Sequence, residues 1–343
     1  MAFNTWSSPH LPVENSVNTM MRRVLLALLP GIVCMTWLFG WGVLLNILIA
    51  SCTALAAEAL ILGLRKRPVT ATLLDCSALL TGVLLALALP PLAPWWIAVI
   101  GSLFAIIIAK QLYGGLGYNP FNPAMVGYVV LLISFPLQLT LWPPAGNYPD
   151  LQATLALVFT GAIPPDSTLD ALTMATPMDS VRMQLGLGET LPGLYGGPLF
   201  GQFAGFGWEW LNVCFLAGGL WLLQLKVIQW QIPLAMLAGL AAPATLFHLI
   251  NPELYATPLF HLFSGAAMLG AFFIATDPVS ACTTPYGRIW YGLGIGVLTW
   301  IIRTWGGYPD GVAFAVLLMN LAAPTLDYYT RPRVFGHSSR KVE

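Results

Sequence analysis

The sequence predicts an all-α polytopic membrane protein, on the evidence of its composition, its apolar segments and an internal repeat. Only 14 Lys and Arg and 14 Asp and Glu occur among 343 residues, which is 8%, against about 25% in an ordinary soluble domain. Apolar residues make up 57%, and the mean hydropathy is +0.77. A soluble globule cannot cover its surface with so few charges, and disorder requires the opposite composition. Because the net charge is zero, no basic field exists to attract nucleic acid.

A membrane span needs about 20 mainly apolar residues, and the chain offers about ten such segments. The polar start followed by Arg22-Arg23 favours a retained first span over a cleaved signal peptide. The expected spans are Val24–Phe39, Trp41–Leu64, Thr70–Leu89, Trp95–Tyr113, Ala124–Leu141, Trp208–Leu225, Ile232–Ile250, Leu259–Thr276, Ile289–Trp305 and Val312–Tyr329.

The distribution of Lys and Arg predicts the orientation of these spans, since cytoplasmic loops carry an excess of both residues. With the N-terminus in the cytoplasm and ten alternating spans, only Arg182 and Arg303 of the 14 basic residues fall outside. We therefore expect both termini to be cytoplasmic.

Two stretches repeat at a nearly fixed offset. The run from Ser77 resembles the run from Ser264, 187 residues later, and Gly114-Gly115 resembles Gly306-Gly307, 192 residues later. Five spans on each side of a long external loop predict a 5+5 inverted repeat, because five is odd. The expected parts are a cytoplasmic segment 1–23, a first repeat 24–141, an external loop 142–207, a second repeat 208–329 and a cytoplasmic tail 330–343.

The long external loop contains Asp170-Ala-Leu-Thr-Met-Ala-Thr176-Pro177. Loops of this length in a compact protein are usually functional. Taken alone, an acidic residue followed by hydroxyls at short spacing is more typical of a helix cap or a turn. The apolar stretch Leu151–Ile163 of the same loop is too short to span and fits the membrane interface.

Three further motifs accompany that loop: Gly117-Tyr-Asn-Pro-Phe-Asn-Pro-Ala-Met-Val-Gly-Tyr128, Ala275-Thr-Asp-Pro-Val-Ser280 and Tyr308-Pro-Asp-Gly. Together they resemble the NqrB/RnfD family, which unites the RnfD (RsxD) component of the Rnf electron-transport complex with the more distant B component of the sodium-pumping NADH:quinone oxidoreductase. The resemblance extends from Arg22 to Gly336, and the asparagine motif is its most specific part. The chain lacks the longer N-terminal extension usual in the quinone reductase component.

The resemblance implies FMN linked by a phosphoester to a threonine of an Asp-x-x-[Ser/Thr]-Gly-Ala-Thr pattern, attached by a flavin transferase that uses FAD as donor. Carried over, the acceptor is Thr176, with Asp170, Thr173 and Ala175 as recognition positions. Met174 stands where the family usually has Gly. The following Pro177 independently favours extended backbone at Thr176.

Asn119 and Asn122 lie three residues apart beside prolines, so their amides are either free for a ligand or cap the fifth span. In the quinone-reductase relative the matching asparagines contact a non-covalent riboflavin. An amide offers both the donor and the acceptor that a flavin edge requires. The sequence leaves open whether a riboflavin binds here.

Ionisable residues within spans often mark ion pathways. Asp277 ranks first, at a break made by Pro278, followed by Glu58 and Asp75. An interhelical pair with a buried donor is the plain alternative for Glu58. The five cysteines show no C-x-x-C spacing, so we expect no metal site.

The resemblance implies a subunit of an ion-translocating oxidoreductase of the ferredoxin:NAD⁺ type in a bacterial inner membrane, with the flavin loop periplasmic. Its partners would be the A, B, C, E and G components of the Rnf complex, the flavin transferase and membrane lipid, and electron flow would be coupled to H⁺ or Na⁺ movement. The chain has no nucleotide-binding glycine loop, so we expect no activity towards NADH on its own. Two alternatives are a flavin-free solute channel or transporter, which would leave the Thr176 motif unexplained, and the B subunit of the sodium-pumping NADH:quinone reductase.

Overall fold

The computed structural model describes residues 16–163, 168, 172–308 and 310–332, and these residues form a helical protein with two halves. Within this part of the chain the only β pairing consists of two isolated bridges, Trp142 with Met174 and Phe200 with Gly205. The first half contains α1 (Val17–Phe39), α2 (Gly42–Leu64), α3 (Val69–Leu73), α4 (Ser77–Ala88), α5 (Trp95–Leu103), the π-helical η1 (Phe104–Gln111), α6 (Pro123–Ser134) and the 3₁₀ turn η2 (Pro136–Leu139).

The connection between the halves contains α7 (Leu151–Thr160), α9 (Pro177–Gly186) and α10 (Leu191–Leu194). The second half contains α11 (Trp208–Gln224), α12 (Gln231–Ile250), α13 (Pro258–Phe263), α14 (Ala267–Leu269), the π-helical η3 (Gly270–Ile274), α15 (Pro285–Trp305) and α16 (Val312–Tyr329).

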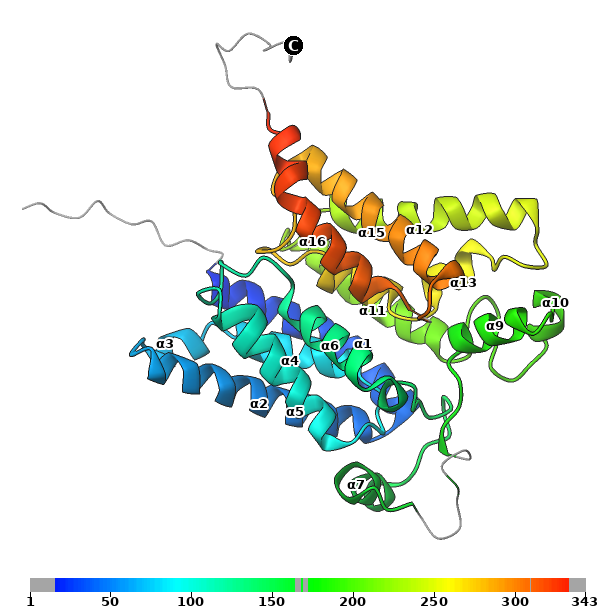
Figure 1. The fold of residues 1–343 in the computed structure, drawn as a ribbon, viewed down its shortest axis with the longest axis horizontal. Helices are drawn as coiled ribbons and strands as arrows, with labels where there is room; N and C mark the ends of the chain where they lie inside the picture. The colour runs from blue at the N-terminus through cyan, green and yellow to red at the C-terminus, as the bar shows by residue number, and fades with distance from the viewer. Residues whose placement is uncertain (1–15, 164–167, 169–171, 309, 333–343) are drawn as a thin grey trace, which may run out of the picture.

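The two halves lie side by side, with α9, α10 and α7 at one end of the helices (Figure 1). They meet where α1 packs along α11 and where α6 packs against α16. At the first contact the backbones approach closely, because a Cβ atom added to Gly218 would lie 2.0 Å from the carbonyl oxygen of Ala27. Only glycine permits this approach.

Helices of the second half follow those of the first in the same order. The helices α11 to α16 each begin between 189 and 191 residues after α1 to α6. The similar stretches in the sequence lie 187 and 192 residues apart, and the repeat stays a prediction. The inversion of one half in a membrane stays a prediction.

Among the described residues, four helices are long and apolar enough to cross a membrane: α1, α2, α12 and α16. Shorter apolar helices include α4, α6 and the continuous run Trp95–Gln111. Large apolar side chains project outward from the long helices, among them Trp37 (70% exposed), Leu249 (76%) and Leu321 (68%). Such surfaces are rare on soluble monomers, so a multi-pass membrane protein is the class that fits.

Three expected spans are shorter or broken. Thr70–Leu89 is two helices, because Cys76 adopts a left-handed backbone (φ 62°) between α3 and α4. Ala124–Leu141 ends as an α-helix at Ser134, and Pro136 begins a separate 3₁₀ turn.

The third expected span, Leu259–Thr276, breaks at Ser264 and Gly265, whose backbones are extended and left-handed. Polar side chains satisfy the freed backbone groups. Arg303 donates to the carbonyl of Ser264 at 3.2 Å, and Asp310 accepts from the amide of Ala266 at 2.7 Å. Both partners come from α15 and the segment after it, so sequence-local reasoning could not find this break.

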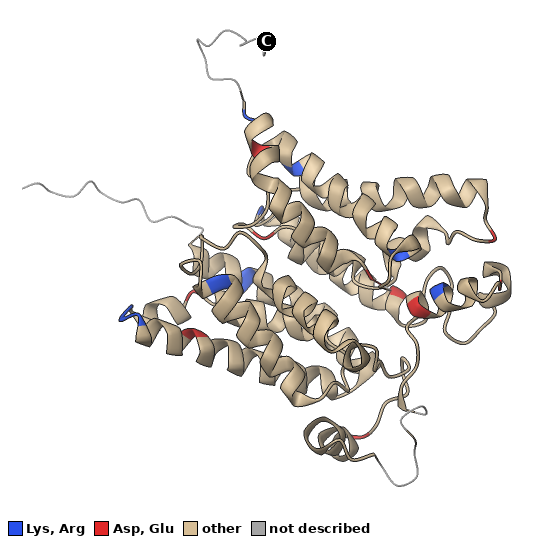
Figure 2. Cartoon of the chain, in the orientation of Figure 1, with Lys and Arg blue, Asp and Glu red and all other residues tan. Residues whose placement is uncertain are grey.

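Charged residues avoid the middle of the long helices. Figure 2 shows most Lys and Arg toward the ends of the helices opposite α9 and α7, with few near α9 and α13. This asymmetry is the structural counterpart of the basic-residue count in the sequence.

Candidate functional site

Thr176 begins α9 as its N-cap residue, with extended backbone (φ −64°, ψ 157°). This backbone is the one predicted from Pro177, which occupies the first helical position. The threonine oxygen accepts from the amide of Asp179 at 3.2 Å, and the hydroxyl donates to the Asp179 carboxylate at 3.2 Å. Thr176 is therefore both a helix cap, as the plain interpretation held, and a half-buried hydroxyl at the start of a helix.

The segment before Thr176 is held against an aromatic cluster. The amide of Met174 donates to the carbonyl of Trp142 at 2.8 Å. The ring of Trp142 lies 5.0 Å from that of Trp208, whose ring lies 5.3 Å from Phe39. Residue 174 thus has a backbone role, while its side chain is exposed.

The other predicted recognition positions lie close by. Ala175 is exposed and Thr173 is half-buried, both directly before the cap. Asp170 lies outside the described residues.

Two cavities meet at Thr176. The larger, of about 280 Å³, is lined by residues from both halves, among them Tyr128, Trp208, Tyr308 and Arg182. The smaller, of about 190 Å³, is lined by Trp142, Met174, Ala175, Leu199 and Phe206, among others. Thr176, Pro177, Trp142 and Trp208 line both cavities. A group attached to the threonine oxygen would therefore adjoin cavities with mainly apolar and aromatic walls.

Two charges stand near the threonine. Burial raises the pKa of Asp179 above its ordinary value, and the hydrogen bond from Thr176 and the charge of Arg182 only partly oppose this rise. Arg182 lines the larger cavity from the next turn of α9. The start of α9 adds the positive end of a helix, so the site has the features of an anion-binding position.

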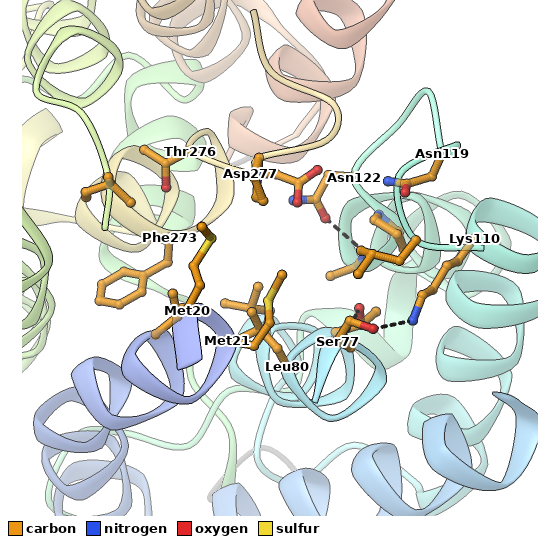
Figure 3. Close-up of a pocket in the computed structure, with 18 of the residues that line it drawn as sticks. Met20, Met21, Ser77, Leu80, Lys110, Asn119, Asn122, Phe273, Thr276 and Asp277 are labelled. Atoms are coloured by element: carbon orange, nitrogen blue, oxygen red, sulfur yellow. Dashed lines mark hydrogen bonds between the residues drawn. The ribbon is translucent and has the colours of Figure 1, made fainter. Parts of the chain in front are cut away.

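Asn119 and Asn122 line a third cavity, of about 110 Å³ (Figure 3). Asn122 caps α6 by accepting from the amides of Ala124 and Met125, and it donates to the carbonyl of Ile274 at 3.2 Å. Its amide is thus engaged as the capping interpretation held.

Asn119 differs. Its amide nitrogen donates to the carbonyl of Phe121 at 3.0 Å. Its side-chain oxygen is buried and has no hydrogen-bond partner among the described residues, which is costly unless a ligand or water supplies a donor.

Lys110 lines the same cavity and belongs to a buried polar cluster (Figure 3). Its ammonium lies 2.6 Å from the carboxylate of Glu58 and 2.6 Å from the hydroxyl of Ser77. Gln111 donates to the same Glu58 oxygen at 2.7 Å. Glu58 is fully buried, so the plain alternative of an interhelical pair describes this residue.

The other two ion-pathway candidates also have local partners. Asp75 accepts from the amide of Ser77 at 2.7 Å, which links it to Lys110 through Ser77. Asp277 accepts from the amide and hydroxyl of Ser280 and lines the third cavity. The structure thus places Asp277 in the wall of the cavity that Asn119, Asn122 and Lys110 also line. Glu58 and Asp75 are not among the residues that line it. No cluster of three metal-ligating residues occurs within the described ranges.

Sequence reasoning missed two residues of these sites. Asp179 follows Thr176 in the pattern of a capping box, a hydroxyl residue with an acidic residue three positions later, and this pattern was the available signal. Lys110 was counted as a cytoplasmic residue near a span end, whereas it is buried and paired.

Comparison with known proteins gives a consistent result. The model of the family described as "NQR2, RnfD, RnfE family" matches residues 4–336. The chain is 54% identical to the D component of the ion-translocating oxidoreductase complex of Escherichia fergusonii, over 98% of this chain and 99% of the relative. It is 53% identical to the protein of the same name from Aliivibrio salmonicida, with the same coverage.

Proposed function

Because the chain belongs to the NQR2, RnfD, RnfE family, we propose that it is the D-type membrane subunit of an ion-translocating electron-transport complex and carries FMN on Thr176. The two relatives are named as subunits of an ion-translocating oxidoreductase complex. The covalent FMN, the coupling to H⁺ or Na⁺ and the direction of electron flow are parts of the proposal.

The observation that carries the flavin proposal is the placement of Thr176. Thr176 stands at the start of a ten-residue helix and lines two cavities with aromatic walls. Bound there, FMN supplies one- and two-electron redox chemistry. The residues fit this group: Trp142 and Trp208 would flank the ring system, while the start of α9 and Arg182 would hold the phosphate.

Flavin fluorescence of the denatured protein band tests this proposal. The chain is co-expressed with a flavin transferase, and wild type is compared with Thr176→Ala. We expect a fluorescent wild-type band and a dark variant band. Thr190→Ala is the matched control, since Thr190 is an exposed threonine of the same loop and should leave fluorescence unchanged. A dark wild-type band beside an active transferase would favour the flavin-free channel or transporter.

A non-covalent riboflavin at the third cavity is the second part of the proposal. The unpartnered oxygen of Asn119 supports it, because a flavin ring carries an N–H donor on its edge. The ring must displace side chains, since about 110 Å³ lies below the usual ligand-pocket range of about 300–1,000 Å³.

Acid extraction of the purified Thr176→Ala protein separates this flavin from the covalent one. We expect free riboflavin in the extract, and its loss in an added Asn119→Ala variant. Asn147→Ala, an exposed asparagine in the connection, serves as control. An extract without flavin contradicts the riboflavin proposal alone.

The remaining parts of the proposal concern placement. We place the protein in a bacterial inner membrane as ten spans in a 5+5 inverted repeat, with residues 142–207 periplasmic and both termini cytoplasmic. Its partners are the A, B, C, E and G components of the complex, and it does not oxidise NADH alone. Asp277 is the first candidate for the coupling ion, because it faces a cavity while Glu58 is closed off by Lys110.

A further inference from the structure

The hydroxyl of Thr176 is already hydrogen-bonded to a carboxylate of its own chain. It donates to Asp179 at 3.2 Å, while the Asp179 amide donates back to the same threonine oxygen. Pro177 fixes the backbone between them at the first helical position. The two side chains are therefore held together by the helix cap itself, before any flavin is attached.

We propose that Asp179 is the general base for flavinylation of Thr176, so that the acceptor chain supplies a catalytic group to its own modification. This inference rests on the proposed function, because it requires that Thr176 receives FMN. Nothing in the family motif read from the sequence includes the position three residues after the threonine.

The chemistry balances with FAD as the donor. The Thr176 oxygen attacks the phosphorus of the FMN half, an oxygen–phosphorus bond forms, and the bond to the bridging pyrophosphate oxygen breaks. AMP leaves with that oxygen. The hydroxyl proton passes to Asp179, and no electron is gained or lost. A threonine hydroxyl is a weak nucleophile until such a base removes its proton.

The surroundings of Asp179 suit a base of this kind. Burial raises its pKa, and a stronger base accepts a proton more readily in the transition state. After transfer, the protonated carboxyl faces the new phosphodiester as a neutral group, which avoids two like charges side by side.

Other charged and titratable groups face Asp179 from three elements. They are Arg182 on α9, Tyr128 on α6, and Tyr308 and Asp310 before α16, all of which line the larger cavity together with Asp179. Arg182 cannot act as a base, because a guanidinium offers only N–H donors and no acceptor. Among the described residues, Tyr128, Tyr308 and Asp310 line the cavity without a hydrogen bond to Thr176, and Asp310 is bound to Arg303 at 3.1 Å. Within the described residues, Asp179 is the carboxylate in hydrogen-bond contact with the acceptor.

A purely structural role makes a different prediction. The backbone cap, from the Asp179 amide to the threonine oxygen, does not depend on the side chain at 179. Asparagine there keeps a hydrogen-bond acceptor for the hydroxyl but cannot take its proton at neutral pH. If Asp179 only orders the cap, Asp179→Asn should accept flavin at nearly the wild-type rate.

The test uses the full chain, purified without flavin, with transferase, Mg²⁺ and FAD added. The rate of appearance of the fluorescent band is measured against FAD concentration. We expect Asp179→Asn to lower the maximal rate by about 10²-fold or more, the usual range for a general base, with little change in the FAD concentration at half-maximal rate. Asp179→Glu should restore part of the rate. Asp150→Asn, which alters the N-cap of α7, is the control and should match wild type.

The pH profile gives a readout that a structural role would not move. Dividing the wild-type rate by the Asp179→Asn rate at each pH cancels the titration of the transferase. We expect this ratio to rise with pH through an acidic transition and then level off. Equal rates with a flat ratio would overturn the role of Asp179 and leave the proposed function standing. A wild-type chain that never accepts flavin from an active transferase would overturn both.

Discussion

At the scale of the residue, some features of the site were predictable from neighbouring residues in the sequence and others were not. The extended backbone of Thr176 was predictable, because Pro177 restricts its neighbour directly. The free oxygen of Asn119 and the bound amide of Asn122 were not, because the two residues share one motif and differ only in their contacts. Counting basic residues likewise placed Lys110 near the membrane interface. Such a count uses only the position of a residue along the chain and not its burial.

The pair of Glu58 and Lys110 yields a prediction of stability. Both side chains are almost fully buried, with exposures of 0% and 2%. Lys110→Met should destabilise the protein by about 3–5 kcal/mol, because it leaves a buried charge without a partner. The double variant Glu58→Gln with Lys110→Met should recover most of this loss. Thermal unfolding in detergent measures the stability of the single and the double variant, with Lys66→Met at an exposed position as control. Equal stability of all variants would contradict the predicted role of the Glu58–Lys110 pair.

The raised pKa of Asp179 predicts a pH dependence in the chain without flavin. The pKa of Asp179 is higher in the folded protein than in a form with α9 unfolded. At a pH between these two pKa values, the folded form therefore binds more protons. Stability of this helix should therefore fall as pH rises through that interval, because the buried carboxyl must ionise. Protection of α9 amides against hydrogen exchange, corrected for the intrinsic rate, measures the effect. Asp179→Asn should abolish this pH dependence. The same pH dependence in the variant would mean that a group other than Asp179 causes it.

At the scale of the element, hydropathy predicted most helices and failed at the breaks. The ends of α2 and α16 agree with the expected spans within one residue. The break at Ser264 depends on Arg303 and Asp310, which are distant in sequence. A hydropathy window averages over such a break, because the flanking residues are apolar on both sides.

The contact between α1 and α11 supports a prediction for a single glycine. A methyl group at position 218 would collide with the Ala27 carbonyl oxygen, and backbone on both sides leaves no flexible side chain to move. Gly218→Ala should therefore cost about 1–3 kcal/mol. Gly63→Ala is the matched control in α2, since nothing lies within 4 Å of its added Cβ atom. Thermal unfolding compares them, and an unaffected Gly218→Ala would mean that the two helices separate easily.

At the scale of the whole molecule, the helix starts in the two halves follow the offset found in the sequence, while the repeat and its orientation in a membrane stay predictions. The repeat offset of 187 to 192 residues in the sequence agrees with helix starts 189 to 191 residues apart. Sidedness depends on the charge asymmetry, which Figure 2 shows as basic residues gathered toward one end of the helices. A measurement in a membrane decides which end faces the cytoplasm.

Cysteine labelling in intact cells determines which end of the helices faces the cytoplasm. Lys66 follows α2 at the end rich in basic residues, and Thr190 precedes α10 at the other end; both are exposed. In a background with the five native cysteines replaced, a membrane-impermeant maleimide applied from the periplasm should label Thr190→Cys at once. Lys66→Cys should react only after the inner membrane is opened. Because two sites at opposite helix ends must face opposite compartments when the helices span, labelling of both from one side would overturn the predicted topology. It would also remove the periplasmic placement of Thr176, whose helix α9 lies in the same connection as Thr190.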